Sequence, residues 1–445
     1  MNSNYQNDVN SSLKYCRIFL GIIGMWPLIN GYANKVERFT STLLIVVSVT
    51  STIFVLIPGG YSFFYVTELE LKIQILGPVC FCFACLLKYC CFGAKASAIK
   101  YCIERIKEDW KFMDDEEHRA IMTESMIVAH KSIIVFSAQM YFSSVSYCII
   151  LPHWSNPILL SDNITYKPLI NPGLDLILGD VVARYYNFIY LVHCIFGFIS
   201  VTIDNSVCGV VLSFVAHACG MFQIQVARLQ HLVDGTKDKR NRLAVIVHEH
   251  TEVLRYADSV SKALQEIFFF DILTSSIAIC ALEYLCVMAW KNGDLVGVVT
   301  YGAACISLGF NMFVICYVGE VLLEEVSSNG ERFGEATYNI RWFDLPQNKK
   351  LDLILLIAIS KYPPKLSGGK IFEISINTFT TCKGLTFLLD RDLYVRDFTG
   401  TQVIVRLPEF VSSCYGMMTT VDISKACSKL NSNHLFNYRL LKNKE

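Results

Sequence analysis

The feature that most constrains this chain is a series of apolar blocks, each about as long as a lipid bilayer is thick. A helix needs about 20 mostly apolar residues to cross the hydrocarbon core. The blocks that meet or approach this length are 39–57, 73–92, 132–152, 185–223, 267–290 and 295–319, with a weaker one at 371–389. The pattern predicts an all-α membrane protein with seven transmembrane helices, the last of them marginal because Glu373 and Lys383 interrupt it.

The composition supports the same class of protein. Hydrophobic residues make up 53% of the chain and charged residues only 18%, whereas soluble chains carry about 25% charged residues. The formal net charge is zero, and no basic tract with interleaved aromatics indicates a nucleic-acid partner. Most of the 18 cysteines fall inside apolar blocks, where we expect free thiols. No motif indicates an enzyme, a cofactor or a metal site.

Four Asp, Glu or Lys residues fall within the first six apolar blocks, where a charge is costly unless it faces protein or water. Lys88 lies near the end of its block, and we expect its long side chain to reach the lipid headgroups. Asp204 lies where the membrane part of its helix should end. It fits either a coupling network between membrane and cytoplasm or an interfacial carboxylate. Asp271 and Glu283 occur together in 267–290.

The stretch 185–223 decides the topology, because its 39 residues contain one charge and fit either a single long helix or a hairpin. Lysine and arginine gather in cytoplasmic loops. If the stretch is a single helix, the connecting segments on one side of the membrane hold 25 lysine and arginine residues, and those on the other side hold 3. The basic side comprises 1–38, 88–128, 218–266 and 324–370, and the other side 59–68, 152–184 and 291–294. We therefore predict one long helix and an intracellular N-terminus.

Two segments on the basic side are amphipathic, which predicts long intracellular helical extensions. The segment 228–266 carries apolar residues at helical spacing among charged ones, and 93–128 does so less regularly. Such helices need a surface to pack on, either one another or a neighbouring subunit. The apolar positions of the first segment are Leu243, Val247, Leu254 and Ala257.

A glycosylation sequon offers an independent indication of the topology. The triplet Asn163-Ile164-Thr165 lies in the 152–184 loop, which the charge bias places outside the cell. We expect Asn163 to be glycosylated. The second sequon, Asn10-Ser11-Ser12, should stay unmodified because its end of the chain is inside.

Aromatic and small residues gather in the outer halves of the third and fourth predicted helices. A small apolar ligand needs a concave, mostly hydrophobic site with a few hydroxyl groups to orient it. An aromatic belt at the membrane surface is the alternative interpretation, and we assign Tyr185 and Tyr186 to it. The residues expected to contact a ligand are Met140, Tyr141, Ser144, Tyr147, Ile189, Tyr190 and His193.

Four stretches in order resemble segments of the insect odorant receptors. The segment 204–232 (DNSVCGVVLSFVAHACGMFQIQVARLQHL) is similar to the family's Asp and HxCGQ…L…RL pattern, with Met221 in place of the usual Gln. The other three are 248–270 (HEHTEVLRYADSVSKALQEIFFF), 333–346 (FGEATYNIRWFDLP) and 361–381 (KYPPKLSGGKIFEISINTFTT). Together the resemblance covers roughly residues 10–381.

The resemblance implies a fold unrelated to G-protein-coupled receptors and a ligand-gated cation channel, in which this chain forms a heterotetramer with the shared odorant co-receptor subunit. It implies a multi-pass protein of the plasma membrane of olfactory sensory neurons, in contact with lipid and detecting small volatile or apolar molecules. The expected organisation is a cytoplasmic N-terminus (1–38), six transmembrane helices with an outer ligand pocket and intracellular extensions (39–323), an intracellular anchor helix with the marginal seventh span (324–389), and an atypical tail (390–445).

The chain departs from the family after Thr381. The family normally continues with an LKTSxSYFxxL type of ending, but this chain reads CKGLTFLLDRDLYVRDFTGTQ and runs on for more than 60 residues. The family's gate would lie here, so no gate residue is assigned. A mis-spliced or read-through terminal exon is one hypothesis for this tail.

Three other functions are compatible with parts of the pattern. A gustatory receptor has a similar architecture, although the order of motifs from 333 to 346 favours the odorant branch. Asp271 and Glu283 within one span motivate a secondary transporter, but the paired halves that often mark transporters are not visible. A G-protein-coupled receptor requires the opposite orientation.

Overall fold

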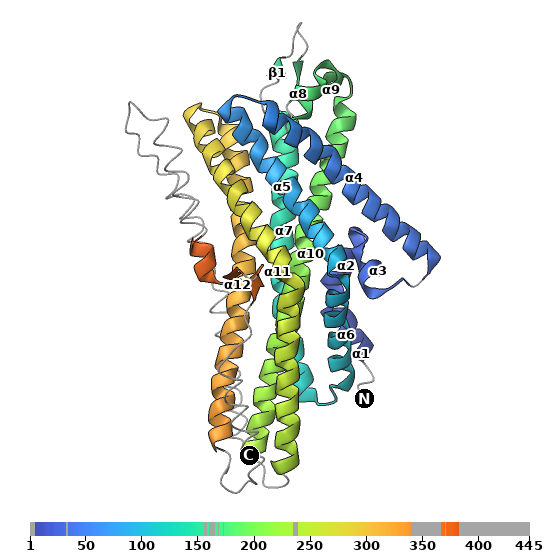
Figure 1. The fold of residues 1–445 in the computed structure, drawn as a ribbon, viewed down its shortest axis with the longest axis vertical. Helices are drawn as coiled ribbons and strands as arrows, with labels where there is room; N and C mark the ends of the chain where they lie inside the picture. The colour runs from blue at the N-terminus through green and yellow to red at the C-terminus, as the bar shows by residue number, and fades with distance from the viewer. Residues whose placement is uncertain are drawn as a thin grey trace. The chain divides into compact units, whose positions relative to one another are not determined.

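The computed structural model describes residues 5–32, 34–154, 158–159, 165–167, 169–171, 173–234, 239–339, 366–369 and 371–381. The chain divides into two compact units, Met1–Asp392 and Leu393–Glu445, and every described residue belongs to the first. The atypical tail predicted at 390–445 and the apolar segment 351–359 lie outside the described residues. The described part of the chain is almost entirely helical (Figure 1).

Six helices among the described residues are long and apolar enough to cross a membrane. Each covers one of the first six predicted blocks, apart from Tyr185 in the fourth, and extends beyond it, because an apolar block marks only the part of a helix that lies in lipid. These helices are α4 (Lys35–Tyr65), α5 (Leu69–Ala94), α7 (Glu116–Trp154), α10 (Tyr186–Asp234), α11 (Lys239–Lys291) and α12 (Leu295–Asn339).

Shorter elements connect the long helices. The helices among them are α1 (Tyr5–Ser12), α2 (Lys14–Ile22), α3 (Met25–Asn30), α6 (Ala96–Phe112), α8 (Leu174–Leu178) and α9 (Asp180–Arg184). Two antiparallel strand pairs join β1 (Ile158–Leu159) to β2 (Thr165–Tyr166) and β3 (Ser367–Gly368) to β4 (Phe372–Glu373). Their registers place Ile158 opposite Tyr166 and Ser367 opposite Glu373.

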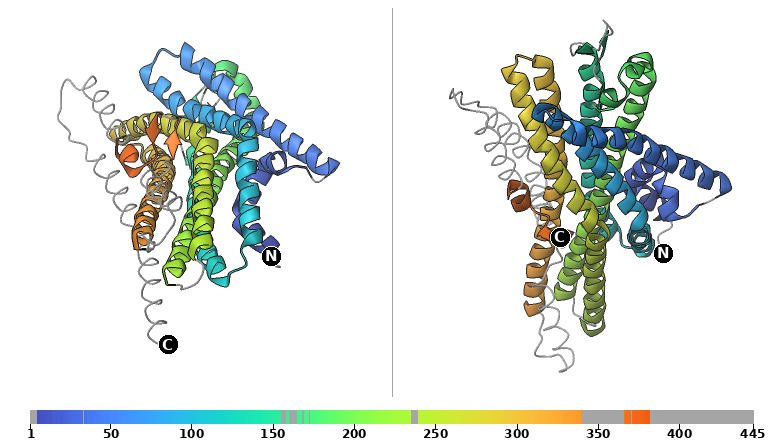
Figure 2. Two further views of the ribbon diagram at one scale, coloured as in Figure 1. Left: turned by 60° about the horizontal axis from the view of Figure 1, so that its bottom comes forward. Right: turned by 45° about the horizontal axis from the view of Figure 1, so that its top comes forward.

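The long helix predicted over 185–223 is a single element, as the charge bias indicated. Helix α10 runs for 49 residues without interruption, and no turn occurs at Asp204. The predicted amphipathic helix over 228–266 is divided between two elements. Its first residues belong to α10, which ends at Asp234, and its remainder from Lys239 continues directly into the fifth apolar block, so that α11 is one helix of 53 residues. Within it, Ala257 is buried and Arg255 is exposed, as expected for an amphipathic helix. Helix α7 lies along α10, and α12 along α11 (Figure 2).

The first membrane helix runs past the point where the sequence indicated its end. We expected the block 39–57 to stop at Pro58-Gly59-Gly60, but α4 continues through Pro58 to Tyr65. Ending a helix inside lipid would leave several backbone groups without partners, so a proline is tolerated within such a span. At the other end, the Asn34 side chain caps α4 by accepting a hydrogen bond of 2.7 Å from the backbone N–H of Glu37.

A glycine contact joins α4 to the loop that precedes α8. Gly173 has a φ of +120°, and a Cβ placed on it would lie only 3.0 Å from the Cα of Gly59. The hydroxyl of Ser62 donates a hydrogen bond of 2.7 Å to the carbonyl of Gly173. Glycine is therefore required at position 173 both by the backbone conformation and by the close approach to α4.

The N-terminal segment is more ordered than its polar composition suggested. Helices α2 and α3 bury apolar residues, and α2 packs against α10. The Cys16 thiol donates to the carbonyl of Gly209 at 3.2 Å, and the Tyr89 hydroxyl donates to the carbonyl of Ile23 at 2.7 Å. The apolar positions Leu13, Cys16, Leu20 and Ile23 recur every three or four residues, which is the helical spacing that makes such a face.

Residues 371–381 begin the region of the predicted seventh span and pack on α12, whereas the preceding residues 366–369 pack on α11. The backbone N–H of Gly369 donates to the carbonyl of Gln265 at 2.8 Å. The backbone N–H of Ile376 donates to the carboxylate of Glu320 on α12 at 3.2 Å. Residues 376–381 are helical, and the rest of the predicted span to residue 389 lies outside the described residues.

Candidate functional site

Helices α7 and α10 carry all seven of the predicted ligand-contact residues and approach each other closely beside them. A Cβ on Gly197 of α10 would lie 3.3 Å from Cys148 Sγ and 3.8 Å from Ser144 Oγ of α7. The absence of a side chain at Gly197 lets the two helices come together. It also places Ser144, one of the predicted residues, against α10.

Tyr141 is held against α10 by two interactions. Its hydroxyl lies 2.9 Å from Thr202 Oγ1, and its ring stacks on Phe198 with centroids 5.7 Å apart. The Thr202 hydroxyl donates its hydrogen to the carbonyl of Phe198 at 2.7 Å. Because a threonine hydroxyl has only one hydrogen, Tyr141 must be the donor to Thr202. Neighbouring Met140 is buried in a cluster with Phe136, Val201 and Cys208.

Tyr190 occupies a second contact between these helices, nearer the end of α7. Its hydroxyl donates to the backbone carbonyl of Cys148 at 3.2 Å. Its ring stacks on Tyr186 with centroids 6.0 Å apart and meets His153 edge-on. This group of aromatic rings fits the interfacial belt, to which we assigned Tyr186, as well as a ligand site.

Ile189 and His193 are the two most buried of the predicted residues on α10. Ile189 packs with Leu169, Leu174 and Val182 beneath the loop that leads into α10. His193 is only 1% exposed, and its Nδ1 atom has no hydrogen-bond partner in the described part of the chain. An unpaired buried nitrogen is costly, so a polar atom of a ligand or a water molecule would stabilise it.

The seven predicted residues do not form one cluster. On α10, the partner of Tyr141 lies nine residues beyond His193, which corresponds to roughly 13 Å at 1.5 Å per residue. Met140 and Tyr141 therefore belong to a deeper level than Ile189, Tyr190 and His193. Ser144 and Tyr147, both half-buried, lie between the two levels along α7.

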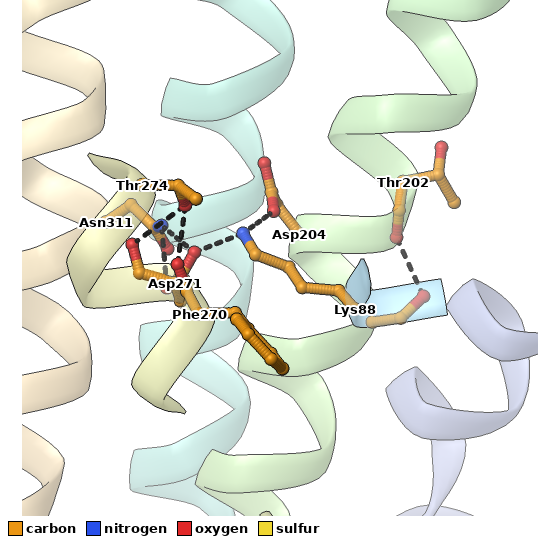
Figure 3. A network of polar contacts seen from close by, with 8 residues as sticks. Lys88, Thr202, Asp204, Phe270, Asp271, Thr274 and Asn311 are labelled. Carbon is orange, nitrogen blue, oxygen red and sulfur yellow. Dashed lines mark hydrogen bonds and ion pairs between the residues drawn. The ribbon is translucent and has the colours of Figure 1, made fainter. Parts of the chain in front are cut away.

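A buried ionic cluster lies deeper still and joins four helices (Figure 3). The ammonium of Lys88 on α5 lies 2.5 Å from Asp204 Oδ1 on α10, and it also pairs with Asp271 on α11. Asn311 on α12 donates from Nδ2 to Asp271 Oδ2 at 3.2 Å. The cluster thus binds α5, α10, α11 and α12 together through polar contacts inside an apolar bundle.

This cluster corrects one expectation drawn from the sequence, for Lys88, and removes one of the two alternatives for Asp204. The expectation that Lys88 reaches the lipid headgroups is wrong, because its side chain is only 3% exposed and points into the protein. The carboxylates of Asp204 and Asp271 supply the partners that a buried ammonium requires. Asp204 is 2% exposed, so it is not an interfacial carboxylate. Sequence reasoning noted these charges singly but did not pair opposite charges from different spans.

A second polar network joins α6 to α10 and α11. His217 Nε2 of α10 donates to Asp109 Oδ2 of α6 at 2.9 Å, and Arg105 Nε lies 3.1 Å from the other oxygen of Asp109. Arg105 also lies 3.5 Å from a carboxylate oxygen of Glu252 on α11. On the same helix, burial raises the pKa of the Cys102 thiol to about 12. These contacts dock α6 on the extended ends of α10 and α11.

Comparison with known proteins decides the family. The family model described as 7tm Odorant receptor matches residues 68–387. The chain belongs to the 7tm odorant receptor family. The matched region contains all four stretches that suggested the resemblance, and it contains α7, α10 and the ionic cluster. This family consists of receptors rather than enzymes, in agreement with the lack of a catalytic motif.

Individual odorant receptors match shorter regions. Odorant receptor 33c of Drosophila melanogaster is 24% identical over 165 residues, which is 36% of this chain and 40% of that protein. The odorant receptor coreceptor of Anopheles gambiae is 25% identical over 145 residues, 33% of this chain and 29% of that protein. The matches therefore span two-fifths or less of the length of these curated relatives.

A solved odorant receptor shares the fold. The olfactory receptor OR5 of Machilis hrabei superposes with a TM-score of 0.67 at 12% identity, covering 88% of this chain and 99% of OR5. The structure of OR5 in complex with eugenol gives a TM-score of 0.65. At this identity the likeness shows the fold alone, and it extends over nearly the whole of the OR5 chain.

Proposed function

We propose that this odorant receptor is the ligand-tuned subunit of a ligand-gated cation channel that detects small volatile or apolar molecules together with a co-receptor. The match of the odorant receptor family model to residues 68–387 is the observation that carries the proposal. Two further findings support it. A relative is itself an odorant receptor coreceptor, and OR5, which shares the fold, has been solved with eugenol bound.

The ligand site belongs to the outer level of α7 and α10. Ile189 supplies apolar surface, and Tyr147 and Ser144 supply hydroxyl groups on the facing helix. His193, with its unpaired buried Nδ1 atom, adds a polar group that could orient a ligand. A ligand opens the channel only by binding the open arrangement more tightly than the closed one, so contacts that differ between the two states determine the response.

The proposed orientation, with the N-terminus in the cytoplasm, rests on the distribution of basic residues. The proposed location, the plasma membrane of olfactory sensory neurons, rests on membership of the odorant receptor family. Lys88 is buried and no longer counts as a loop residue, but its removal leaves the charge bias strongly one-sided. The intracellular extensions of α10 and α11 then carry the basic segment 218–266 on the cytoplasmic side.

Electrophysiology with the co-receptor tests the proposal. Cells that express this chain and the co-receptor should show odorant-evoked cation currents from a broad panel of volatiles, and cells lacking this chain should not respond in the same way. The reversal potential should follow the cation gradients, as expected for a channel. Stoichiometric uptake of a substrate would instead indicate the transporter.

A substitution pair tests the placement of the ligand site. Ile189→Trp should abolish or retune the response, because a larger ring would fill space next to His193. Ile195→Trp is the matched control, since Ile195 lies on the same helix with 41% of its surface exposed. Surface labelling of both variants shows whether the protein reaches the membrane. Unchanged tuning of a surface-expressed Ile189→Trp variant would contradict this placement.

A further inference from the structure

The buried ionic cluster carries more negative than positive charge. Lys88 contributes one positive charge, whereas Asp204 and Asp271 contribute two negative charges if both are ionised. All three side chains are 3% exposed or less. A net charge inside a bundle of apolar helices is costly because the surroundings have a low dielectric constant. One further positive charge is needed to neutralise the cluster.

We propose that Asp204 and Asp271 share one bound proton, which makes this cluster a proton-binding site within the membrane. With one proton, the cluster consists of an ammonium, a carboxylate and a carboxylic acid, and its net charge is zero. This inference rests on the contacts of the cluster alone and is independent of the proposed ligand and of channel activity.

The hydrogen-bond pattern favours Asp204 as the residue that carries the proton. Asp271 is well supplied with donors, since it pairs with Lys88 and its two oxygens lie 3.2 and 3.5 Å from Asn311 Nδ2. Asp204 Oδ1 accepts from Lys88, but its Oδ2 atom is buried with no partner among the described residues. A carboxylate oxygen without donors is the one that most favours protonation.

A proton fits the cluster better than a metal cation does. The only anionic groups in the cluster that could bind a metal ion are two carboxylates. Lys88 already occupies the space between them and would repel a second cation. The described residues contain no group of three or more His, Cys, Asp or Glu side chains that could hold a metal ion. A proton needs no coordination shell and can be held by a single oxygen.

The neighbouring groups supply no other compensating charge. Among the described residues, the thiols of Cys85 on α5 and Cys208 on α10 interact electrostatically with both carboxyl groups, and neither thiol can become positive. The Thr274 hydroxyl on α11 donates to the backbone carbonyl of Phe270 at 2.6 Å rather than to a carboxylate. From α12 the facing group is the neutral amide of Asn311, and no residue of α4 or α7 forms an ion pair with the cluster in the described part of the chain.

Charge balance then predicts how substitutions behave. Asp204→Asn removes a carboxyl group and its proton together, so Lys88 and Asp271 remain as a neutral pair. In Asp271→Asn, Asp204 should lose its proton and pair with Lys88 as a carboxylate. The double variant leaves the Lys88 ammonium buried without a counter-charge. Each single variant should reach the cell surface at close to wild-type levels, whereas the double variant should fall by about tenfold or more.

Infrared difference spectroscopy of the purified full-length receptor in lipid nanodiscs tests the proposal directly. At neutral pH, subtraction of the Asp204→Asn spectrum from that of the wild type should reveal the carbonyl stretch of one buried carboxylic acid. Asp271→Asn should lose the same band, and Lys88→Met should gain a second one because both carboxyl groups then take protons. Glu108→Gln, which removes an exposed carboxylate on α6, is the control and should leave this region unchanged.

Two results would overturn the proposal. The first is a wild-type spectrum that does not differ from that of Asp204→Asn in the carboxylic-acid region. The second is a thermal stability that rises with sodium or potassium concentration in the wild type but not in Asp204→Asn, which would show that a metal cation neutralises the cluster. If Lys88→Met fails to fold, the wild type and the two single aspartate variants still decide the question.

Discussion

The imidazole of His217 donates a hydrogen bond of 2.9 Å to the carboxylate of Asp109, and this contact joins the extended end of α10 to α6. Asp109 also accepts from Arg105, so its side chain links two basic groups. Asp109→Ala would leave the buried His217 without its acceptor and would leave Arg105 with only its contact to Glu252. We expect this variant to lower the free energy of unfolding by about 1–3 kcal/mol, measured by thermal unfolding in detergent.

A control on the same helix separates this effect from a general loss of surface charge. Glu104→Ala removes an exposed pair with Lys100 at 3.7 Å, and such pairs contribute about 0.3–0.5 kcal/mol. Alkylation of the buried Cys102 thiol provides a local measurement. If α6 undocks in Asp109→Ala, Cys102 should react faster with a maleimide than in Glu104→Ala; equal rates would show that His217 does not hold α6 in place.

The hydrogen bond from Tyr141 to Thr202 gives a second prediction. Tyr141→Phe keeps the ring that stacks on Phe198 but removes the donor, which should reduce stability by about 1 kcal/mol. Because the bond joins α7 to α10 below the proposed ligand site, the odorant concentration for half-maximal response should also shift. Tyr185→Phe is the control, since Tyr185 is 56% exposed at the start of α10. Indistinguishable dose–response curves for the two variants would argue against this coupling.

Gly319 and Gly302 on α12 provide a matched pair for the third prediction. A Cβ at Gly319 would collide with the backbone carbonyl of Ile374, whereas one at Gly302 would meet only Cys286 Sγ at 3.8 Å. Gly319→Ala should displace residues 371–381 from α12 and weaken the bond from Ile376 to Glu320. We expect loss of odorant-evoked current in Gly319→Ala and normal current in Gly302→Ala, with surface expression measured for both. Normal currents in both would mean that this packing is dispensable.

The two sequons test the orientation of the chain in the membrane. Asn163 lies outside the described residues, and its loop is proposed to be extracellular. Asn10 lies on α1, which is proposed to be cytoplasmic. Asn163→Gln should remove a mobility shift that is sensitive to glycosidase, whereas Asn10→Gln should change nothing. A glycosidase-sensitive mobility shift that is lost in Asn10→Gln would place the N-terminus outside the cell and contradict the proposed topology.

Much of the fold was predictable because lipid imposes strong rules on sequence. The uninterrupted α10 followed from the distribution of basic residues around 185–223, since only one arrangement kept them on one side. The sequence pattern did not predict that α4 continues through Pro58. A proline usually ends a helix in a soluble protein, but it is tolerated in a transmembrane helix. The face formed by Leu13, Cys16, Leu20 and Ile23 was missed because it is too short to register as a hydrophobic block.

The site was less predictable than the fold, for a geometric reason. The residue types marked Tyr141 and His193 as candidate ligand contacts. A sequence does not show that the contact of Tyr141 with α10 lies at a different depth in the bundle from His193. It also does not show which charges from distant spans meet. The rule that charges within a span seek partners could have linked Lys88 to Asp204 and Asp271, because these are opposite charges in different helices.

Helix α10 carries His193 near its first residue, and His217 lies in its second half. Its 49 residues form a rod of roughly 74 Å, and the hydrogen bonds along its axis make it stiff. A small tilt imposed beside His193 would therefore move the opposite tip sideways by a larger amount, as a lever does about its pivot. The ion pair to Lys88, partway along the rod, lies where such a pivot would be, so the receptor could convert a slight displacement near His193 into a large one at the opposite tip of α10.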